Sequence, residues 1–132
     1  MDLKTISAVD LAEAIRTRKI SSTEAVGFAL ERLKSVHGAC NAAVSTDTEE
    51  ALAAAAETDA AIARGESAGP LAGVPLAHKD MFDRVGKIPS WGARIRRDKP
   101  STEDNTLLAR LKSAGSIEIA ALHLTEFAFG PT

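Results

Sequence analysis

Lys79 is the residue whose type and position point most directly to chemistry. It closes the apolar run 74–79, which predicts a short, mostly buried strand, and Asp80 follows it. Ligand sites in α/β proteins collect where such strands end. Burial of an ammonium group lowers its pKa and can leave a neutral amine that acts as a base. Lys79 is therefore a candidate general base. A solvated lysine at a strand end, near Asp80 and Asp83, is the ordinary alternative.

The histidines and the single cysteine add no second catalytic group. His37, His78 and His123 show no H-x-x-x-H spacing, so the sequence predicts no zinc site. Side chains alternate along a strand, so His78 and Lys79 are expected on opposite faces, without a direct chemical role for His78. Cys40 is interpreted as a small, buried or half-buried thiol near a helix end.

The composition is that of a soluble globular chain. The length of 132 residues suits one domain or part of one, and 45% hydrophobic with 26% charged residues excludes a disordered tail. No apolar stretch reaches the roughly 18–20 residues of a membrane-spanning helix, and the N-terminus has no signal-peptide pattern. A net charge of −2 lacks the basic excess of a nucleic-acid binder. One cysteine, which cannot form an internal disulfide, favours a cytoplasmic location.

Helices predominate in the predicted structure of residues 1–66. Ser7 is a cap for the first helix, and Ser21 with Glu24 has capping-box spacing for the second, which Gly38 is expected to end. These start signals are followed by apolar residues at three- and four-residue steps, which is the helical period.

A brief strand is expected over 41–45, before a third helix. Asp47 and Glu50 have capping-box spacing and predict an Ala-rich helix to about Arg64, closed by Gly65. So many alanines allow this helix to pack closely against a neighbour.

Residues 67–132 predict strands, turns and one clear helix. Glycines and prolines interrupt any period over 81–103, which predicts a long loop. The later part predicts a helix over 104–114, a strand over 116–122 with Ile117 and Ile119 on one face, and the start of a further element over 124–129. A helix between two strands favours a parallel pair, so the fold class is α/β. Two or three strands leave sheet edges unpaired, so the architecture is expected to be incomplete.

The residues that surround Lys79 resemble a known motif. Gly69-Pro-Leu-Ala-Gly-Val-Pro-Leu-Ala-His-Lys-Asp80 is similar to the G-P-L-x-G-V-P-x-x-x-K-D segment of the amidase signature family, which includes amide hydrolases and the A subunits of aminoacyl-tRNA amidotransferases. Gly86, the run 104–115 and Thr125-Glu126-Phe127-Ala128 resemble later blocks of that family. The resemblance covers nearly the whole chain.

The resemblance implies amide hydrolysis by a Ser-Ser-Lys triad with no metal and no organic cofactor. Lys79 matches the lysine base of the family, and Asp80 is expected to support its surroundings. Met81, Trp91 and Phe127 are the candidates for positions near a small-molecule amide substrate, with ordinary core packing as the alternative for each.

Both serines of such a triad belong to a Gly- and Ser-rich segment that the family carries after the E-F-A block. None of Ser90, Ser101, Ser113 and Ser116 lies in such a segment. The chain is therefore expected to be a single incomplete domain over 1–132, with a helical part over 1–66 and the start of the α/β amidase core over 67–132. Alone it is expected to be inactive. Self-association or a partner chain that completes the open sheet is the alternative role.

Five basic residues fall within the predicted loop: Lys87, Arg94, Arg96, Arg97 and Lys99. With Trp91 nearby, they raise the alternative of tRNA contact, since tRNA is a partner of one branch of the family. Asp98 and the acidic net charge argue against it, and a solvated loop is the preferred interpretation.

Overall fold

A three-stranded mixed sheet forms the centre of the computed structural model, which describes residues 2–96 and 98–130. Its strands are β1 (Ala43–Thr46), β2 (Pro75–Lys79) and β3 (Ile117–Leu122), in the order β1-β3-β2. β3 runs antiparallel to β1 and parallel to β2, with α4 (Thr106–Ser113) between β2 and β3 in the chain. This confirms the α/β class and the parallel pair around a helix.

The helices before β2 are α1 (Ala8–Arg16), α2 (Ser22–Cys40) and α3 (Thr48–Ala63). The Ser7 hydroxyl accepts the amide of Asp10, and both bonds of the Ser21–Glu24 capping box are present, as predicted. The prediction that Gly38 ends the second helix is wrong. The helix continues to Cys40, and Asn41 takes the left-handed conformation that glycine was expected to supply.

Two further expectations about this region are wrong. Cys40 is exposed and lies in the last turn of α2. Asp47 is the N-cap residue of α3, yet its side chain makes no capping bond. Its carboxylate instead meets Arg84 and Lys87 from the long loop, and these cations compete for it.

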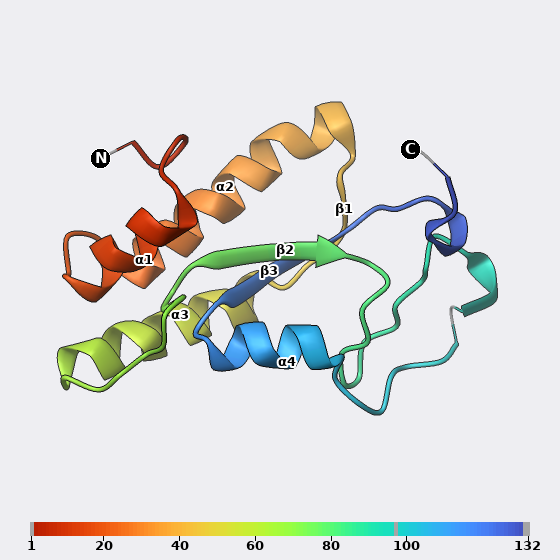
Figure 1. Ribbon diagram of the computed structural model, residues 1–132. Coiled ribbons are helices and arrows are strands. Elements are labelled where there is room, and N and C mark those ends of the chain that lie inside the picture. The colour runs from red at the N-terminus through yellow and green to blue at the C-terminus, as the bar shows by residue number, and fades with distance from the viewer. Residues whose placement is uncertain (1, 97, 131–132) are drawn as a thin grey trace.

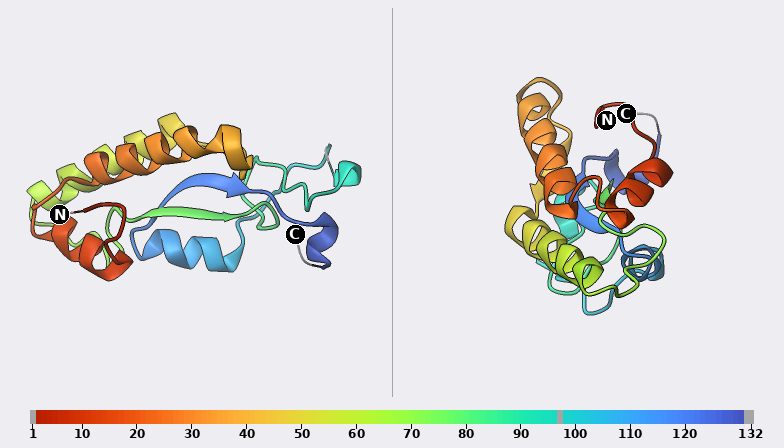
Figure 2. Two further views of the ribbon diagram at one scale, coloured as in Figure 1. Left: turned by 90° about the horizontal axis from the view of Figure 1, so that it is seen from above. Right: turned by 90° about the vertical axis from the view of Figure 1, so that its left-hand side faces the viewer.

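Helices cover both sides of the sheet. α2 and α3 lie together on one side, and α4 lies on the other (Figures 1 and 2). Within the described residues β2 borders only β3, so its outer edge is open. Among the described residues no helix is long and apolar enough to cross a membrane.

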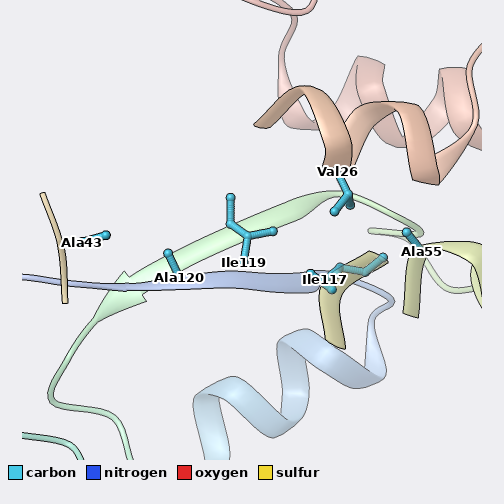
Figure 3. Close-up of a cluster of buried hydrophobic side chains, with 7 residues drawn as sticks. Val26, Ala43, Ala55, Ile117, Ile119 and Ala120 are labelled. Carbon is cyan, nitrogen blue, oxygen red and sulfur yellow. The ribbon is translucent and has the colours of Figure 1, made fainter. Parts of the chain in front are cut away.

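The main core lies between the sheet and the pair α2 and α3 (Figure 3). Val26, Ala55 and Ala120 have no exposed surface, and Ile117 and Ile119 are buried beside them. The shared burial of the two isoleucines confirms that they face the same core. The small side chains of α3 let it pack closely on α2 and β3, as its composition predicted.

Between β2 and α4 the chain has little regular structure, which confirms the predicted loop. Its described part contains one short 3-10 helix, Arg94–Arg96, and an isolated bridge between Val85 and Ser101. A second 3-10 helix, Glu126–Ala128, is the element expected after β3. The loop and this final segment lie together at the end of the sheet where β2 and β3 finish (Figure 1).

Candidate active site

Lys79 lies at the carboxyl end of the parallel pair β2 and β3. It is the last residue of β2, its register partner on β3 is Leu122, and its Nζ donates to the carbonyl oxygen of His123 at 2.8 Å. The side chain thus reaches across the ends of both strands. Lys79 is exposed in the described structure, as in the alternative of a solvated lysine at a strand end. The reason is that its side chain extends past the last strand residue, where no described element covers it.

His78 points to the other face of β2, as alternation predicted. It is buried, with 7% of its surface exposed, whereas Lys79 is exposed. The pairing of β2 with β3 shifts register between Leu76 and Ala77, just before these two residues. Such irregularities re-aim the side chains that follow them.

Asp80 is buried and anchors the long loop. Its Oδ2 accepts a hydrogen bond from the Ser90 main-chain amide at 3.0 Å and another from the Ser90 hydroxyl. Its main chain donates to the carbonyl of Leu122 at 2.9 Å and accepts the amide of Trp91 at 3.0 Å. Asp80 therefore ties the loop to the sheet directly after Lys79, which is a structural way to support the lysine.

Trp91 and Phe127 belong to two segments that cross next to Asp80. The Phe127 amide donates to the carbonyl oxygen of Trp91 at 2.7 Å, and both residues have positive φ angles, of 53° for Phe127 and 54° for Trp91. The Trp91 ring is half-buried, and its indole N–H has no acceptor among the described residues. Phe127 is 53% exposed, and Met81 is half-buried. The structure thus brings all five candidates to one end of the sheet and leaves Phe127 largely open to solvent.

An ion cluster that sequence reasoning missed lies beside β3. Arg84 pairs with both Asp47 and Glu118, and Lys87 pairs with Asp47 at 2.9 Å and with Glu50 at 3.2 Å. The cluster borders a cavity of about 530 Å³ between α3 and α4. Its members come from three separate segments, the start of α3, the long loop and β3, so no local spacing indicates it.

The cluster changes the acidity of its carboxyl groups. Burial by itself raises the pKa of Asp47, but hydrogen bonds from Arg84 and Lys87 outweigh burial and hold that pKa below its usual value. The His78 ring beside Glu118 is the main influence that lowers the pKa of Glu118, against burial and with help from Arg84. Hydrogen bonds to Asp47 and Glu50 raise the pKa of Lys87.

The five basic residues of the loop do not all face solvent as one group. Lys87 belongs to the ion cluster, and the Arg96 guanidinium lies 5.7 Å from the centre of the Trp91 ring. Arg94 and Lys99 are exposed, and Arg97 lies outside the described residues.

Three of the serines considered above have hydrogen-bond partners, and the Ser113 hydroxyl donates to the carbonyl oxygen of Ala109 at 2.9 Å. The Ser90 hydroxyl bonds to Asp80, and the Ser101 hydroxyl donates to Asp83 at 2.6 Å. No group of three or more His, Cys, Asp and Glu residues that could hold a metal is found in the part of the chain that the structure describes.

Comparison with known proteins identifies the family. The model of the Amidase family matches residues 24–132. The chain belongs to the Amidase family. The fold agrees: a peptide amidase from Stenotrophomonas maltophilia superposes with a TM-score of 0.84 at 25% identity, covering 93% of this amidase-family chain and 26% of the enzyme.

Curated relatives point the same way. The A subunit of the glutamyl-tRNA(Gln) amidotransferase of Azoarcus sp. (strain BH72) is 41% identical over 94% of this chain, and that of Nocardia farcinica is 41% identical over 98%. A solved chain from a vestigial protein complex, described for the origins of an s-triazine catabolic enzyme, superposes with a TM-score of 0.90 at 35% identity over 95% of this chain. This amidase-family chain spans about a quarter of the length of the curated relatives it matches, 25% and 26% for these two.

Proposed function

We propose that Lys79 is the general base of a Ser-Ser-Lys site that cleaves a carboxylic amide, and that residues 1–132 supply this base without either serine. The position of Lys79 carries the proposal: in an Amidase-family chain it ends a strand beside a parallel neighbour, with its amine held by the His123 carbonyl. The carboxyl ends of parallel strands are where α/β proteins place their ligands.

In the proposed reaction, the Lys79 amine is the final acceptor of the proton. It donates one N–H to the carbonyl of His123, which leaves its lone pair free to accept a proton. A bridging serine passes its hydroxyl proton to Lys79 and takes the proton of the nucleophilic serine, whose oxygen attacks the amide carbonyl. The protons return along the same path to the leaving nitrogen as the C–N bond breaks. Water or another acceptor then resolves the acyl-enzyme.

Lys79→Met in the protein as it occurs in its source tests the proposal. The intact mass comes first, because a mass well above 13.8 kDa means that the serines are to be sought on the same chain. Release of ammonia from a panel of simple primary amides is then measured. We expect turnover to fall by at least about 100-fold, the usual size of a general-base contribution. Lys34→Met, on the exposed side of α2, is the matched control and should leave turnover unchanged. Equal turnover in both variants would contradict the proposal.

The proposed inactivity of residues 1–132 alone has its own test. We expect this chain by itself to release no ammonia from those amides and to bind no fluorophosphonate probe, because such probes label an activated serine. Labelling that disappears in Lys79→Met would show that a working serine lies within these residues.

A second candidate function is delivery of the released ammonia to a charged tRNA, with glutamine as the amide. Curated relatives at 41% identity, which are named as subunits of a glutamyl-tRNA(Gln) amidotransferase, favour it. Transfer of ammonia from glutamine to a charged tRNA would support this second function, and release of ammonia into solution would support the first. Salt-sensitive tRNA binding that Arg94→Ala weakens would place the contact on the loop.

A partner chain and a cytoplasmic location stay predictions. The open outer edge of β2 presents unpaired main-chain groups, which favour pairing with a further strand. Sedimentation velocity is expected to show association, and a clean stable monomer would contradict it. Fractionation of source cells tests the location.

A further inference from the structure

We propose that His78 is a positioning residue for Lys79, whose ring bridges the main-chain carbonyl of the lysine and the carboxylate of Glu118. The inference rests on the proposed function of Lys79 but concerns a different residue, on the opposite face of β2. Nothing in the motif that carries Lys79 assigns a task to the residue before it.

The first side of the bridge is a hydrogen bond. His78 Nδ1 lies 2.9 Å from the carbonyl oxygen of Lys79, which also accepts the amide of Met81 at 2.7 Å. A carbonyl oxygen only accepts hydrogen bonds, so Nδ1 must carry the proton. This fixes the tautomer of the ring. It also holds the peptide unit at which β2 ends and the loop begins.

The second side of the bridge is a contact with a carboxylate. His78 Nε2 lies 3.7 Å from Glu118 Oε2, and only 4% of the His78 side chain is exposed. Nε2 is fully buried and has no hydrogen-bond partner among the described residues. Without a proton, Nε2 is a hydrogen-bond acceptor, and so is the Glu118 carboxylate. Two buried acceptors that face each other without a donor are unfavourable. A proton on Nε2 turns the same contact into an ion pair, and the bridge is then complete.

Other groups around the ring are consistent with a fixed position. The Phe82 ring packs against it edge-on, with centroids 5.9 Å apart. The charged groups that face Glu118 are His78 itself, Arg84 from the loop at 3.4 Å, and Lys112 from α4. Beyond Arg84 lie Asp47 at the start of α3, and Lys87.

The bridge therefore connects the peptide of the proposed base to the ion cluster. Through His78, a shift of Glu118 is transmitted to the carbonyl of Lys79. The register irregularity between Leu76 and Ala77 comes just before His78 and aims its ring at β3.

Two isosteric variants separate the two sides of the bridge. In His78→Asn, the amide nitrogen takes the place of Nδ1 and can still donate to the Lys79 carbonyl, but it cannot reach Glu118. In His78→Gln, the amide nitrogen takes the place of Nε2 and keeps only the Glu118 side. We expect amide turnover by the protein to stay within about twofold in His78→Asn and to fall about tenfold in His78→Gln, the cost of one main-chain hydrogen bond.

A spectroscopic measurement tests the bridge without using activity. In protein labelled with ¹⁵N-histidine, Nδ1 of His78 should carry a proton even at a pH where the exposed rings are neutral, and Nε2 should carry one as well wherever the ion pair with Glu118 forms. His37 and His123, which are exposed, are the internal controls and should show mainly Nε2–H. The carboxyl carbon of Glu118, followed by NMR through an acid titration, should titrate at higher pH in His78→Asn than in His78→Gln.

The outcomes separate this inference from the function on which it rests. An Nε2–H tautomer at His78, or an equal loss of turnover in both variants, would overturn the positioning role. If Lys79→Met keeps full turnover while His78 shows the Nδ1–H tautomer, the proposed function fails and the bridge stands as a structural link. If either variant fails to fold, as judged by thermal unfolding, the tautomer in the unsubstituted protein decides.

Discussion

The amide of Phe127 donates to the carbonyl oxygen of Trp91 at 2.7 Å, although the two residues lie far apart in the chain. Both hold left-handed backbone conformations, which cost free energy for residues with a Cβ atom. Gly92 lies at the same crossing and approaches the main chain of Leu124. Strained residues that meet at one place are typical of functional sites. Here they lie beside the end of the strand that carries Lys79.

Gly92→Ala should destabilise the protein by about 3 kcal/mol, because strain and a steric clash combine there. A Cβ atom at this position would lie 2.8 Å from the Leu124 carbonyl oxygen, with φ at +68°. Gly86→Ala is the matched control, since it has φ of +76° but nothing within 4 Å of its Cβ. It should cost only about 1 kcal/mol. Urea unfolding measures the stability of both variants. Equal losses of stability would mean that the backbone at Gly92 can shift to accommodate the added Cβ atom.

Asp80 and Ser90 should be energetically coupled. Asp80→Ala removes a buried carboxylate and leaves the Ser90 amide without its acceptor, so we expect a loss of about 3 kcal/mol. Ser90→Ala removes the hydroxyl, which donates to Asp80 and accepts a hydrogen bond from the Gly92 amide at 3.2 Å, and should cost about 1 kcal/mol. A double-mutant cycle by chemical unfolding should give a coupling of about 1 kcal/mol. Strict additivity would show that the bond between the two side chains contributes nothing.

The ion cluster should make stability fall in acid. The folded-state pKa values of Asp47 and Glu118 lie below their usual values, so their contribution is present above the ordinary carboxyl pKa of about 4. It is lost as the pH falls through the lowered values, because protonated carboxyls no longer pair with Arg84. Asp47→Asn should remove about 2 kcal/mol at pH 7 and much less at pH 3.

Glu49→Gln provides the comparison for this pH dependence. Glu49 is also near the start of α3 but is exposed and forms no ion pair among the described residues. Unfolding of this variant should follow the unsubstituted protein at both pH values. A loss in Asp47→Asn that is the same at pH 3 and pH 7 would argue against an ionic contribution.

Ala55 should not tolerate a larger side chain. It has no exposed surface, and it packs in the core with Val26 and Ala120. Ala55→Leu should cost about 1–3 kcal/mol through overpacking. Ala56→Leu, one residue further on the exposed side of α3, should change stability by less than about 0.5 kcal/mol. Thermal unfolding of the pair tests whether α3 must pack closely.

Local signals predicted much of the fold. The capping box at Ser21 and Glu24 operates within four residues, and the alternation that separates His78 from Lys79 operates between neighbours, so both could be seen in the sequence. The parallel pair followed from the helix between its strands. The match of spaced motifs found the family.

Predictions failed where a distant group decided the outcome. Asp47 has the spacing of a capping residue, but Arg84 and Lys87 bind its carboxylate from 37 and 40 residues away. At the end of α2, a left-handed Asn41 replaced the expected glycine. The environment of Lys79 also depends on residues beyond its own strand. Spacing alone left a buried and a solvated Lys79 both open, and the described structure has it exposed.

The strand order has a consequence for how the protein is made. β1 and β2 do not pair with each other, and each pairs only with β3, the last strand of the described chain. During synthesis, neither earlier strand can therefore acquire a partner in this sheet until Leu122 has left the ribosome. Until then both expose main-chain groups that other chains could bind. A nascent chain stalled before residue 117 should thus depend on chaperones, and one released past residue 122 should depend on them less.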